Sequence, residues 1–325
     1  MPHTMVSGRY GEEEPMKKLM LAVFVLAVVL AALPVVTGNL ETKELNDDVR
    51  KNLGRNFMKL PDGMVHYDVS GPGKGELVVL VHGNAAPYFS WDKNLQALTG
   101  AGFRVVRYDL YGFGYSDRPD VIYSRELYDR QLSEVLAKLN IKGPVNLVGT
   151  SQGGSIAVYF AAKHPERVKR LALLSPFINV LPMKAMIGLI KVPGIGDYLG
   201  RVALDRININ YPKKVFADIS AIPDEYTEKY REQLSYRGFK RARLSNLRGD
   251  SLADFTPQYE TVGKSKIPVL LTWGTADIVI MADSIANIRK AVPDLEYHEI
   301  EGGGHLVHYE SPEKVNPVLL RFLKE

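Results

Sequence analysis

From about residue 56 onward, short apolar runs alternate with longer segments of helical periodicity. A short continuous apolar run is typical of a strand buried on both faces, and strands separated by helices indicate a mostly parallel sheet. The predicted strands follow a hairpin over 57–70 and lie at 76–81, 103–108, 145–148, 168–174, 267–273 and 295–300. The predicted helices lie near 124–140, 152–163, 283–291 and 312–324. The pattern therefore predicts an α/β fold with a mostly parallel central sheet flanked by helices.

One long segment interrupts this alternation. From residue 176 to residue 262 the sequence is helical or irregular and contains no run typical of a buried strand. This length far exceeds that of an ordinary connection between a strand and the next helix. We therefore expect an inserted, mainly helical cap at 176–262, which divides the core into residues 56–175 and 263–325.

The start of the chain carries a different apolar run. Residues 19–36 contain no charge and follow Lys17 and Lys18. A helix needs about 20 apolar residues to cross a bilayer, and a secretory signal peptide has the same basic start and apolar centre. We interpret residues 1–38 as an N-terminal extension with a signal peptide or single-pass anchor, and 39–55 as a polar linker. Both alternatives predict a membrane-associated or secreted protein whose catalytic domain is extracytoplasmic.

Composition narrows the classes of function. The 41 basic and 37 acidic residues give a net charge of +4, which is too small for this length to indicate nucleic acid as a partner. Cysteine is absent, which excludes a disulfide scaffold, a thiolate metal site and a cysteine nucleophile. The sequence contains no cluster with metal-ligand spacing and no cofactor motif, so we expect neither a metal nor a cofactor.

A candidate nucleophile lies between a predicted strand and a predicted helix. Residues 149–153 read G-T-S-Q-G, the G-x-S-x-G pattern, with Ser151 at its centre. In this context the serine occupies a tight, strained turn, and the flanking glycines let the strand and the helix approach each other closely. Ser151 is therefore the predicted nucleophile.

A serine hydroxyl is a weak nucleophile and needs a general base. Among the seven histidines, His305 follows the last predicted strand in the glycine-rich turn E-G-G-G-H, from which an imidazole can reach back over the sheet edge. His308 is its nearest competitor. His82, in the loop after the strand at 76–81, is interpreted as a residue that holds this loop through hydrogen bonds.

The base in turn needs an acid to fix its tautomer and to stabilise the imidazolium. Asp277 follows the predicted strand at 267–273, whereas its neighbour Asp283 is better placed as the N-cap of the following helix. Ser151, Asp277 and His305 each follow their own predicted strand, so their side chains are expected to meet at one edge of the sheet. We predict that they form a catalytic triad.

An oxyanion hole requires backbone N–H groups directed at the developing negative charge. Gln152, the residue after the nucleophile, supplies one predicted donor. The second should come from the turn that contains His82 and Gly83, and we assign it to the N–H of Asn84.

With these residues in place, the chain resembles the α/β-hydrolase-fold enzymes. Residues 82–91, HGNAAPYFSW, resemble the HG loop of that family, and residues 109–116 match its D-x-x-G-x-G-x-S loop. The chain order serine, aspartate, histidine is also that of the family. The resemblance covers residues 56–325 apart from the insertion. It implies that the insertion covers the active site and selects the substrate.

The residue at the nucleophile position separates the subfamilies. Haloalkane dehalogenases and epoxide hydrolases carry aspartate there, so Ser151 argues against both. The resemblance implies an esterase-like or lipase-like serine hydrolase that cleaves small-molecule carboxylic esters through an acyl-enzyme. The alternatives are a C–C bond hydrolase of the meta-cleavage type, a cofactor-free haloperoxidase or perhydrolase, and a catalytically silent binding module on the same fold.

Two segments of the predicted cap bear on the substrate. Residues 177–204 are rich in Ile, Leu, Val and Met, and residues 237–248 carry five basic side chains without an acidic one. Helices that bury one face and solvate the other account for both segments. The alternative is an apolar lip beside a basic surface that contacts anionic lipid, which would extend the prediction to lipid-like or long-chain esters.

Overall fold

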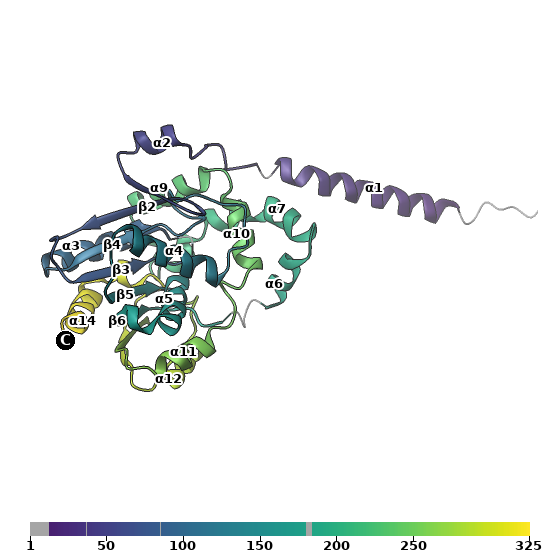
Figure 1. Ribbon diagram of the computed structural model, residues 1–325. Helices are drawn as coiled ribbons and strands as arrows, with labels where there is room; N and C mark the ends of the chain where they lie inside the picture. Colours follow the sequence, from purple (N-terminus) through teal and green to yellow (C-terminus); the bar gives the residue numbers. More distant parts are fainter. Residues whose placement is uncertain (1–12, 37, 85, 180–183) are drawn as a thin grey trace, which may run out of the picture.

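The computed structural model describes residues 13–36, 38–84, 86–179 and 184–325 (Figure 1). Its centre is one eight-stranded sheet with the order β1-β2-β4-β3-β5-β6-β7-β8. The strands are β1 (Asn56–Leu60), β2 (Gly63–Ser70), β3 (Leu77–Val81), β4 (Arg104–Tyr108), β5 (Val145–Thr150), β6 (Val168–Leu174), β7 (Val269–Gly274) and β8 (Glu296–Ile300). β1 and β2 form an antiparallel hairpin, β2 pairs antiparallel with β4, and all other neighbours are parallel. The predicted mostly parallel sheet is confirmed.

Alternate residues along the central strands belong to two separate hydrophobic clusters. In β3, Val79 and Val81 belong to one cluster, and Val78 and Leu80 to the other. This division follows from the strand geometry, because successive side chains point to opposite faces of a sheet. From β3 onward, the helices outside the insertion are α3 (Asp92–Gly100), α4 (Arg125–Lys138), α5 (Gln152–Lys163), α12 (Ala282–Ala291), α13 (Val307–Glu310) and α14 (Pro312–Lys324). Of these, α3 and the single-turn α13 were not predicted.

The predicted helical insertion follows β6 and contains no strand among its described residues. Its helices are α6 (Lys184–Lys191), α7 (Ile195–Ile209), α8 (Pro212–Val215), α9 (Asp224–Ser235), α10 (Phe239–Arg248) and α11 (Thr256–Gly263). Helix α7 packs against α6, α9 and α10, whereas α11 packs against α5 and α12. The last helix before β7 therefore contacts the helices beside the sheet rather than the rest of the insertion.

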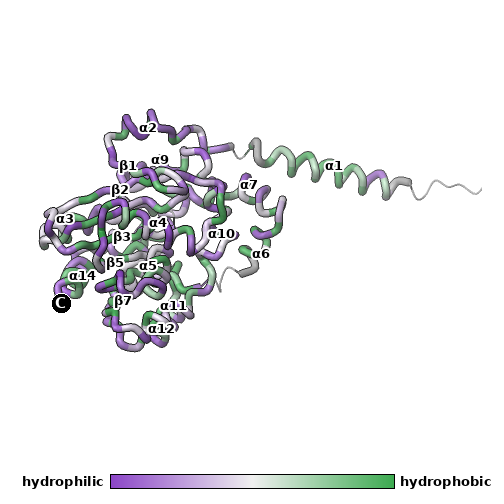
Figure 2. The backbone as a smooth tube through the Cα atoms, in the orientation of Figure 1, coloured by the Kyte–Doolittle hydropathy of each residue, from purple (hydrophilic) through white to green (hydrophobic). Residues whose placement is uncertain are grey.

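The N-terminal apolar run forms one long helix, α1 (Glu13–Val36), which extends away from the rest of the protein (Figure 1). Residues Pro15–Leu33 are long and apolar enough to cross a membrane, and none of this segment is buried. Figure 2 shows the helix as a continuous hydrophobic stretch that projects beyond a surface of mixed polarity. In a buried core helix, by contrast, other parts of the protein would cover these apolar side chains.

The polar stretch after α1 is hydrogen-bonded to the insertion. The N–H of Lys43 donates to the carbonyl of Ser235 at 2.9 Å, and the N–H of Arg237 donates to the carbonyl of Lys43 at 2.9 Å. The N–H of Leu40 donates to Asp205 Oδ2 at 3.2 Å. Helix α2 (Asp47–Asn52) follows, with the side chain of its N-cap residue accepting a hydrogen bond. Residues 39–44 therefore form a strap along the insertion, which we call the 39–44 strap.

Removal of the 39–44 strap should destabilise the protein, whereas removal of α1 alone should not. We expect a chain of residues 39–325 to fold like the full chain. A chain of residues 46–325 loses several partly buried hydrogen bonds, which should lower its Tm by roughly 2–6 °C. Circular dichroism melts of both chains in the same buffer measure this difference. Equal Tm values would show that the strap contributes nothing to stability.

A buried histidine anchors the C-terminal helices under the HG loop. The ring of His308 in α13 lies 4.4 Å from the ring of Trp91, which ends the short helix η1 (Tyr88–Trp91). The Asn94 side chain donates to the backbone carbonyl of His308 at 3.0 Å. Burial, together with the positive charge that His305 can carry, lowers the pKa of His308 to about 3. The imidazole is therefore neutral in the folded protein at neutral pH.

The depressed pKa of His308 predicts a loss of stability in acid. The unfolded chain, in which a histidine has a pKa of about 6.5, binds this proton more readily than the folded chain between pH 6.5 and about 3. The free energy of unfolding should therefore fall on acidification through this window, with this group contributing up to about 1.4 kcal/mol per pH unit. His308→Phe keeps a planar ring and should flatten this limb in urea unfolding between pH 7 and 4. An unchanged slope would contradict the assignment.

Candidate active site

The predicted nucleophile occupies a strained turn between β5 and α5. Ser151 has φ 51° and ψ −124°, a positive-φ conformation that residues other than glycine rarely adopt. A Cβ atom at Gly149 would lie 2.4 Å from the carbonyl oxygen of Gly153, and one at Gly153 would lie 2.2 Å from that of Val81. Both positions therefore require glycine, as the sequence pattern predicts.

The predicted base and acid are in direct contact. His305 Nδ1 lies 2.9 Å from Asp277 Oδ2, and both side chains are buried. The other carboxylate oxygen of Asp277 accepts the N–H groups of Val279 and Ile280 at 2.7 and 2.9 Å, which fixes the carboxylate. An ionised carboxylate only accepts hydrogen bonds, so it favours the imidazole tautomer with the proton on Nδ1. Nε2 is then free to accept a proton.

Ser151 and His305 follow strands of the same sheet but are not hydrogen-bonded to each other in this structure. Ser151 directly follows β5, while Asp277 and His305 follow the ends of β7 and β8, at the carboxyl edge of the sheet. His305 Nε2 is buried and has no hydrogen-bond partner among the described residues. Catalytic hydrogen bonds are often long without substrate and tighten when it binds. The acid–base pair is thus formed, and the complete triad stays a prediction.

The two residues predicted to form the oxyanion hole lie on either side of Ser151. Gln152 is the first residue of α5, where backbone N–H groups have no partner within the helix. The loop with Asn84 lies against the nucleophile, since a Cβ atom at Gly83 would be 2.9 Å from Ser151 Cβ. Asn84 Oδ1 has no partner among the described residues. The N–H groups of Gln152 and Asn84 remain the predicted donors.

A buried aspartate holds the loops around the site. Asp109 accepts hydrogen bonds from the ring of His66 at 2.7 Å and from the N–H of Tyr88 in the HG loop at 2.9 Å. Burial alone would raise the pKa of Asp109, but His66 and His82 outweigh it and lower the pKa below its usual value. His82 Nε2 accepts the N–H of Leu110 at 2.9 Å. His82 thus holds its loop through hydrogen bonds, as predicted.

The side chain of Gln152 links the core to the insertion. It exchanges two hydrogen bonds with the side chain of Asn246 in α10, at 2.9 and 3.1 Å. The amide of Asn246 is also within reach of the hydroxyls of Tyr128, at 3.4 Å, and Ser251. This buried amide pair was not predicted, because no local pattern shows which insertion residue will face the nucleophile turn.

An arginine of the insertion is buried without a counter-charge. Arg243 in α10 is 6% exposed, and its Nε and Nη1 atoms have no hydrogen-bond partner among the described residues. It lies within electrostatic range of Tyr211 and Tyr230, and Tyr211 is within range of Asp277. The sequence contains a usable signal for this burial, because the helical spacing places Arg243 on the same face of α10 as Phe239, Ala242 and Leu247. The sequence interpretation placed Arg243 on a solvated basic face, which is wrong.

Further polar groups on the same side of the insertion lack protein partners. The hydroxyls of Tyr226 and Tyr230 and both polar side-chain atoms of Asn208 are buried without hydrogen bonds to the described residues. The rings of Tyr230 and Tyr211 stack at 6.2 Å, and burial raises the pKa of Tyr211 to about 12. Native proteins bury few unpaired polar groups. Such a cluster, of which Tyr211 lies within electrostatic range of Asp277, is typical of a surface that meets a polar ligand.

His308 and Asp283, the alternative candidates for base and acid, form no contact like that between His305 and Asp277. His308 is buried against Trp91, and its lowered pKa keeps it neutral. Asp283 lies in the first turn of α12, whose N-cap is Met281, so the predicted N-cap position of Asp283 is wrong by two residues. Within the described part of the chain, no group of three or more histidine, aspartate or glutamate side chains could hold a metal ion.

Comparison with known proteins places this geometry in a family. A family model described as alpha/beta hydrolase fold matches residues 76–312. A 2-hydroxy-6-oxononadienedioate/2-hydroxy-6-oxononatrienedioate hydrolase from Paraburkholderia phymatum is 31% identical over 276 residues, covering 80% of this chain and 90% of the relative. Bromoperoxidase from Bacillus anthracis superimposes with a TM-score of 0.72 at 23% identity, covering 84% of this chain and 100% of that one. Cfl2 from Burkholderia cenocepacia gives 0.71 at 23% identity, covering 82% and 95%.

The matched segment contains all five predicted site residues, from Asn84 to His305. It also contains the strained serine turn and the His305–Asp277 contact, which were derived from the chain itself. The identity of 31% over most of both chains extends the match beyond the fold. The chain belongs to the α/β-hydrolase fold family.

Proposed function

We propose that this protein hydrolyses a bond next to a carbonyl group of an anionic small molecule, with Ser151 as nucleophile, His305 as general base and Asp277 as the acid that orients it. His305 takes the proton of the Ser151 hydroxyl while the oxygen attacks the carbonyl carbon. The N–H groups of Asn84 and Gln152 stabilise the resulting oxyanion. The strained backbone of Ser151 supports this role, because a nucleophilic serine on this fold occupies such a strained turn between a strand and a helix.

The unpaired guanidinium of Arg243 carries the assignment of the substrate class. A buried charge without a counter-ion is costly, and a bound carboxylate would offset that cost through bidentate hydrogen bonds. The Paraburkholderia relative is named for a substrate with two carboxylates and a ketone. We therefore propose a C–C bond hydrolase of the meta-cleavage type, whose substrate places a carboxylate against Arg243.

The proposed reaction balances without a cofactor. Ser151 Oγ forms a bond to the ketone carbon. The C–C bond between this carbon and its neighbour on the dienoate side breaks. The bond breaks in the 2,6-dioxo tautomer of the substrate, which forms when the enol proton moves to the carbon beside the ketone. The electron pair then delocalises into the conjugated 2-oxo group as a dienolate, and His305 returns its proton to the dienolate oxygen. Water, activated by His305, then hydrolyses the acyl-enzyme to the carboxylic acid and free Ser151.

The second candidate is hydrolysis of carboxylic esters, the main expectation from the sequence. The same groups perform this reaction, with an alkoxide in place of the carbon leaving group. The specific observation in its favour is α1, whose apolar length suits a protein held close to lipid esters. We propose that α1 is retained as a membrane anchor, with the catalytic part outside the cytoplasm.

The triad assignment predicts large losses of turnover. Ser151→Ala and His305→Ala should each lower kcat by about 10⁴-fold, because the nucleophile and its base act as one unit. Asp277→Asn should cost a similar factor by favouring the wrong imidazole tautomer. Steady-state assays with p-nitrophenyl acetate and with a 2-hydroxy-6-oxo-dienedioate measure these losses. Ser284→Ala, on α12 outside the site, is the control. Losses below tenfold for Ser151→Ala would refute the mechanism.

Substitution of Arg243 distinguishes the two candidate functions. Arg243→Gln should raise KM for the dienedioate by about 10–100-fold, since it removes hydrogen bonds to a charged group. The kcat/KM for neutral p-nitrophenyl acetate should change much less. The matched control is Arg241→Gln, because Arg241 lies two residues earlier in α10, is exposed and pairs with Asp120. Hydrolysis of esters but not of the dienedioate by the unaltered protein would favour the ester hydrolase instead.

A further inference from the structure

Helix α1 leaves the protein beside the insertion and contacts it. The hydroxyl of Tyr198 in α7 donates to the backbone carbonyl of Leu30 in α1 at 2.8 Å, and the two helices pack together. In Figure 1, α6 and α7 lie on the side of the molecule from which α1 projects. Leu30 belongs to the apolar segment Pro15–Leu33. If α1 crosses a bilayer, Tyr198 therefore lies at the level of its interface, where tyrosine is enriched.

The residues that follow α1 are close in sequence to its end and hydrogen-bonded to the insertion. Lys240 Nζ donates to Asn39 Oδ1 at 2.7 Å and to Asp205 Oδ2 at 3.0 Å, and its backbone N–H donates to Glu41 at 2.5 Å. From Leu33 to Asn39 the chain can span at most about 20 Å. The headgroup region on each side of the hydrocarbon core is about 5–8 Å thick. Parts of α7 and α10 are thus held within reach of the headgroups.

This side of the insertion exposes apolar side chains. Leu189, Val192 and Ile195, around the turn between α6 and α7, are 48%, 42% and 47% exposed. Val121 and Ile122, in the loop before α4, are 39% and 73% exposed. Large apolar side chains gathered on one surface indicate an interaction site rather than ordinary surface composition.

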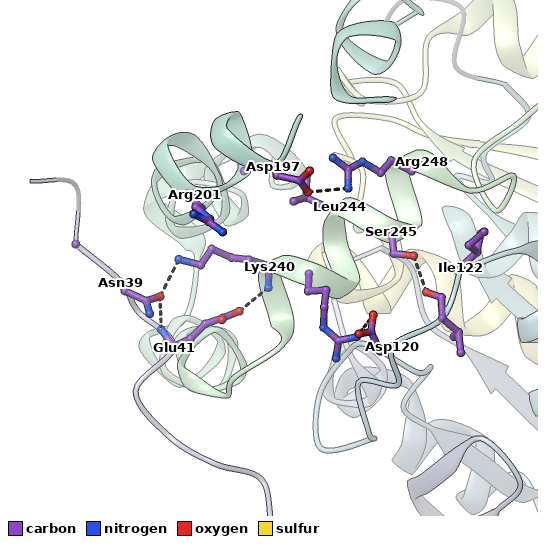
Figure 3. Close-up of a pocket in the computed structure, with 14 residues that line it drawn as sticks. Asn39, Glu41, Asp120, Ile122, Asp197, Arg201, Lys240, Leu244, Ser245 and Arg248 are labelled. Carbon is purple, nitrogen blue, oxygen red and sulfur yellow. Dashed lines mark hydrogen bonds and ion pairs between the residues drawn. The ribbon is translucent and has the colours of Figure 1, made fainter. Parts of the chain in front are cut away.

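A cavity of about 910 Å³ lies between the loop with Val121 and Ile122 and helices α7 and α10 (Figure 3). Val121, Ile122, Gly200 and Leu244 supply apolar parts of its wall, and Arg248 lines it while donating to the carbonyl of Ile190 in α6 at 3.0 Å. Arg248 thus connects the wall of the cavity to α6, the helix before the turn that carries Val192 and Ile195. We call the two apolar groups together with Arg201, that is Val121, Ile122, Leu189, Val192, Ile195 and Arg201, the α1 face.

The charges around the cavity suit a phospholipid headgroup. Arg241 pairs with Asp120 and Arg248 with Asp197. Arg201 lines the cavity and forms no ion pair with the described residues, although it lies within electrostatic range of Asp197, which pairs with Arg248. Figure 3 draws no hydrogen bond or ion pair from Arg201 to the other residues shown. A cation without a direct ion pair, beside apolar side chains, matches the phosphate and the upper acyl chain of a lipid.

We propose that the α1 face is an interfacial membrane-binding surface that inserts among phospholipid headgroups next to the point where α1 crosses the bilayer. The α6–α7 turn and Ile122 enter the boundary between headgroups and acyl chains, while Arg201 contacts lipid phosphate. The 39–44 strap holds this orientation. The inference rests on the proposed anchorage through α1 and is independent of the reaction catalysed.

The absence of cysteine allows a direct test on the full chain. Ile122→Cys and Val192→Cys report on the α1 face, Val25→Cys on α1, and Ile219→Cys is the control. Ile219 is 55% exposed and follows Asp218, which lines a different hollow beside Glu310 and Glu313. Each variant is labelled with the fluorophore NBD and reconstituted in phosphatidylcholine nanodiscs without quencher, with lipid that carries a doxyl group near the headgroup (shallow quencher), or with lipid that carries it near the acyl-chain end (deep quencher).

We expect labels at 122 and 192 to lose roughly half of their fluorescence or more with the shallow quencher, because an interfacial surface enters the outer ~10 Å of the bilayer. The label at 25, near the middle of the segment Pro15–Leu33, should lose a similar share with the deep quencher. The label at 219 should keep its intensity. Quenching at 25 without quenching at 122 and 192 would overturn the α1 face and leave the anchor intact. No quenching at 25 would refute the anchor and, with it, this inference. A blue shift at 192 without doxyl quenching would assign the face to another protein surface.

Discussion

The close approach of α5 to β3 and β5 is the constraint on which the site depends. Backbone atoms of Gly149, Gly153 and Val81 lie very near one another. A Cβ atom at Gly149 or Gly153 would lie 2.2 to 2.4 Å from a backbone oxygen, closer than real Cβ atoms come. Only this approach places the first turn of α5 directly after the strained Ser151. The same turn brings the N–H of Gln152 beside the nucleophile. A side chain at Gly149 or Gly153 would therefore disturb the nucleophile and its candidate oxyanion donor together.

A second layer of the site is electrostatic. Asp109 is fully buried and ties the HG loop, through Tyr88, to the hairpin residue His66. A buried carboxylate is stable only if its hydrogen bonds are satisfied, and this one also accepts the N–H of Tyr115 at 3.0 Å. The loop that approaches Ser151 is thus held from behind by charge-assisted hydrogen bonds. The reacting groups themselves need not supply this rigidity.

The central sheet and the pairing of His305 with Asp277 could be predicted from the sequence, because both depend on local patterns. Buried parallel strands are short apolar runs, and residues that follow such strands meet at one sheet edge. Helix α3 has only Asn94 and Leu98 buried, so its periodic signal is weak. The role of Arg243 and the 39–44 strap depends on contacts between segments far apart in the chain. The helical spacing of Arg243 with Phe239, Ala242 and Leu247 indicates that this basic residue is buried, but no local pattern shows which groups of the core it will face.

The pair of amide hydrogen bonds between Gln152 and Asn246 has a consequence for how substrate enters. These bonds cross the boundary between the core and the insertion, and both residues are buried. Lifting α10 away from the core would break both bonds, each worth about 0.5–1.5 kcal/mol. Asn246 Oδ1 would keep the hydroxyl of Ser251, so three amide groups would lose their partners. Helix α10 is therefore fixed to the core at this point. A substrate that enters without displacing α10 leaves both hydrogen bonds intact.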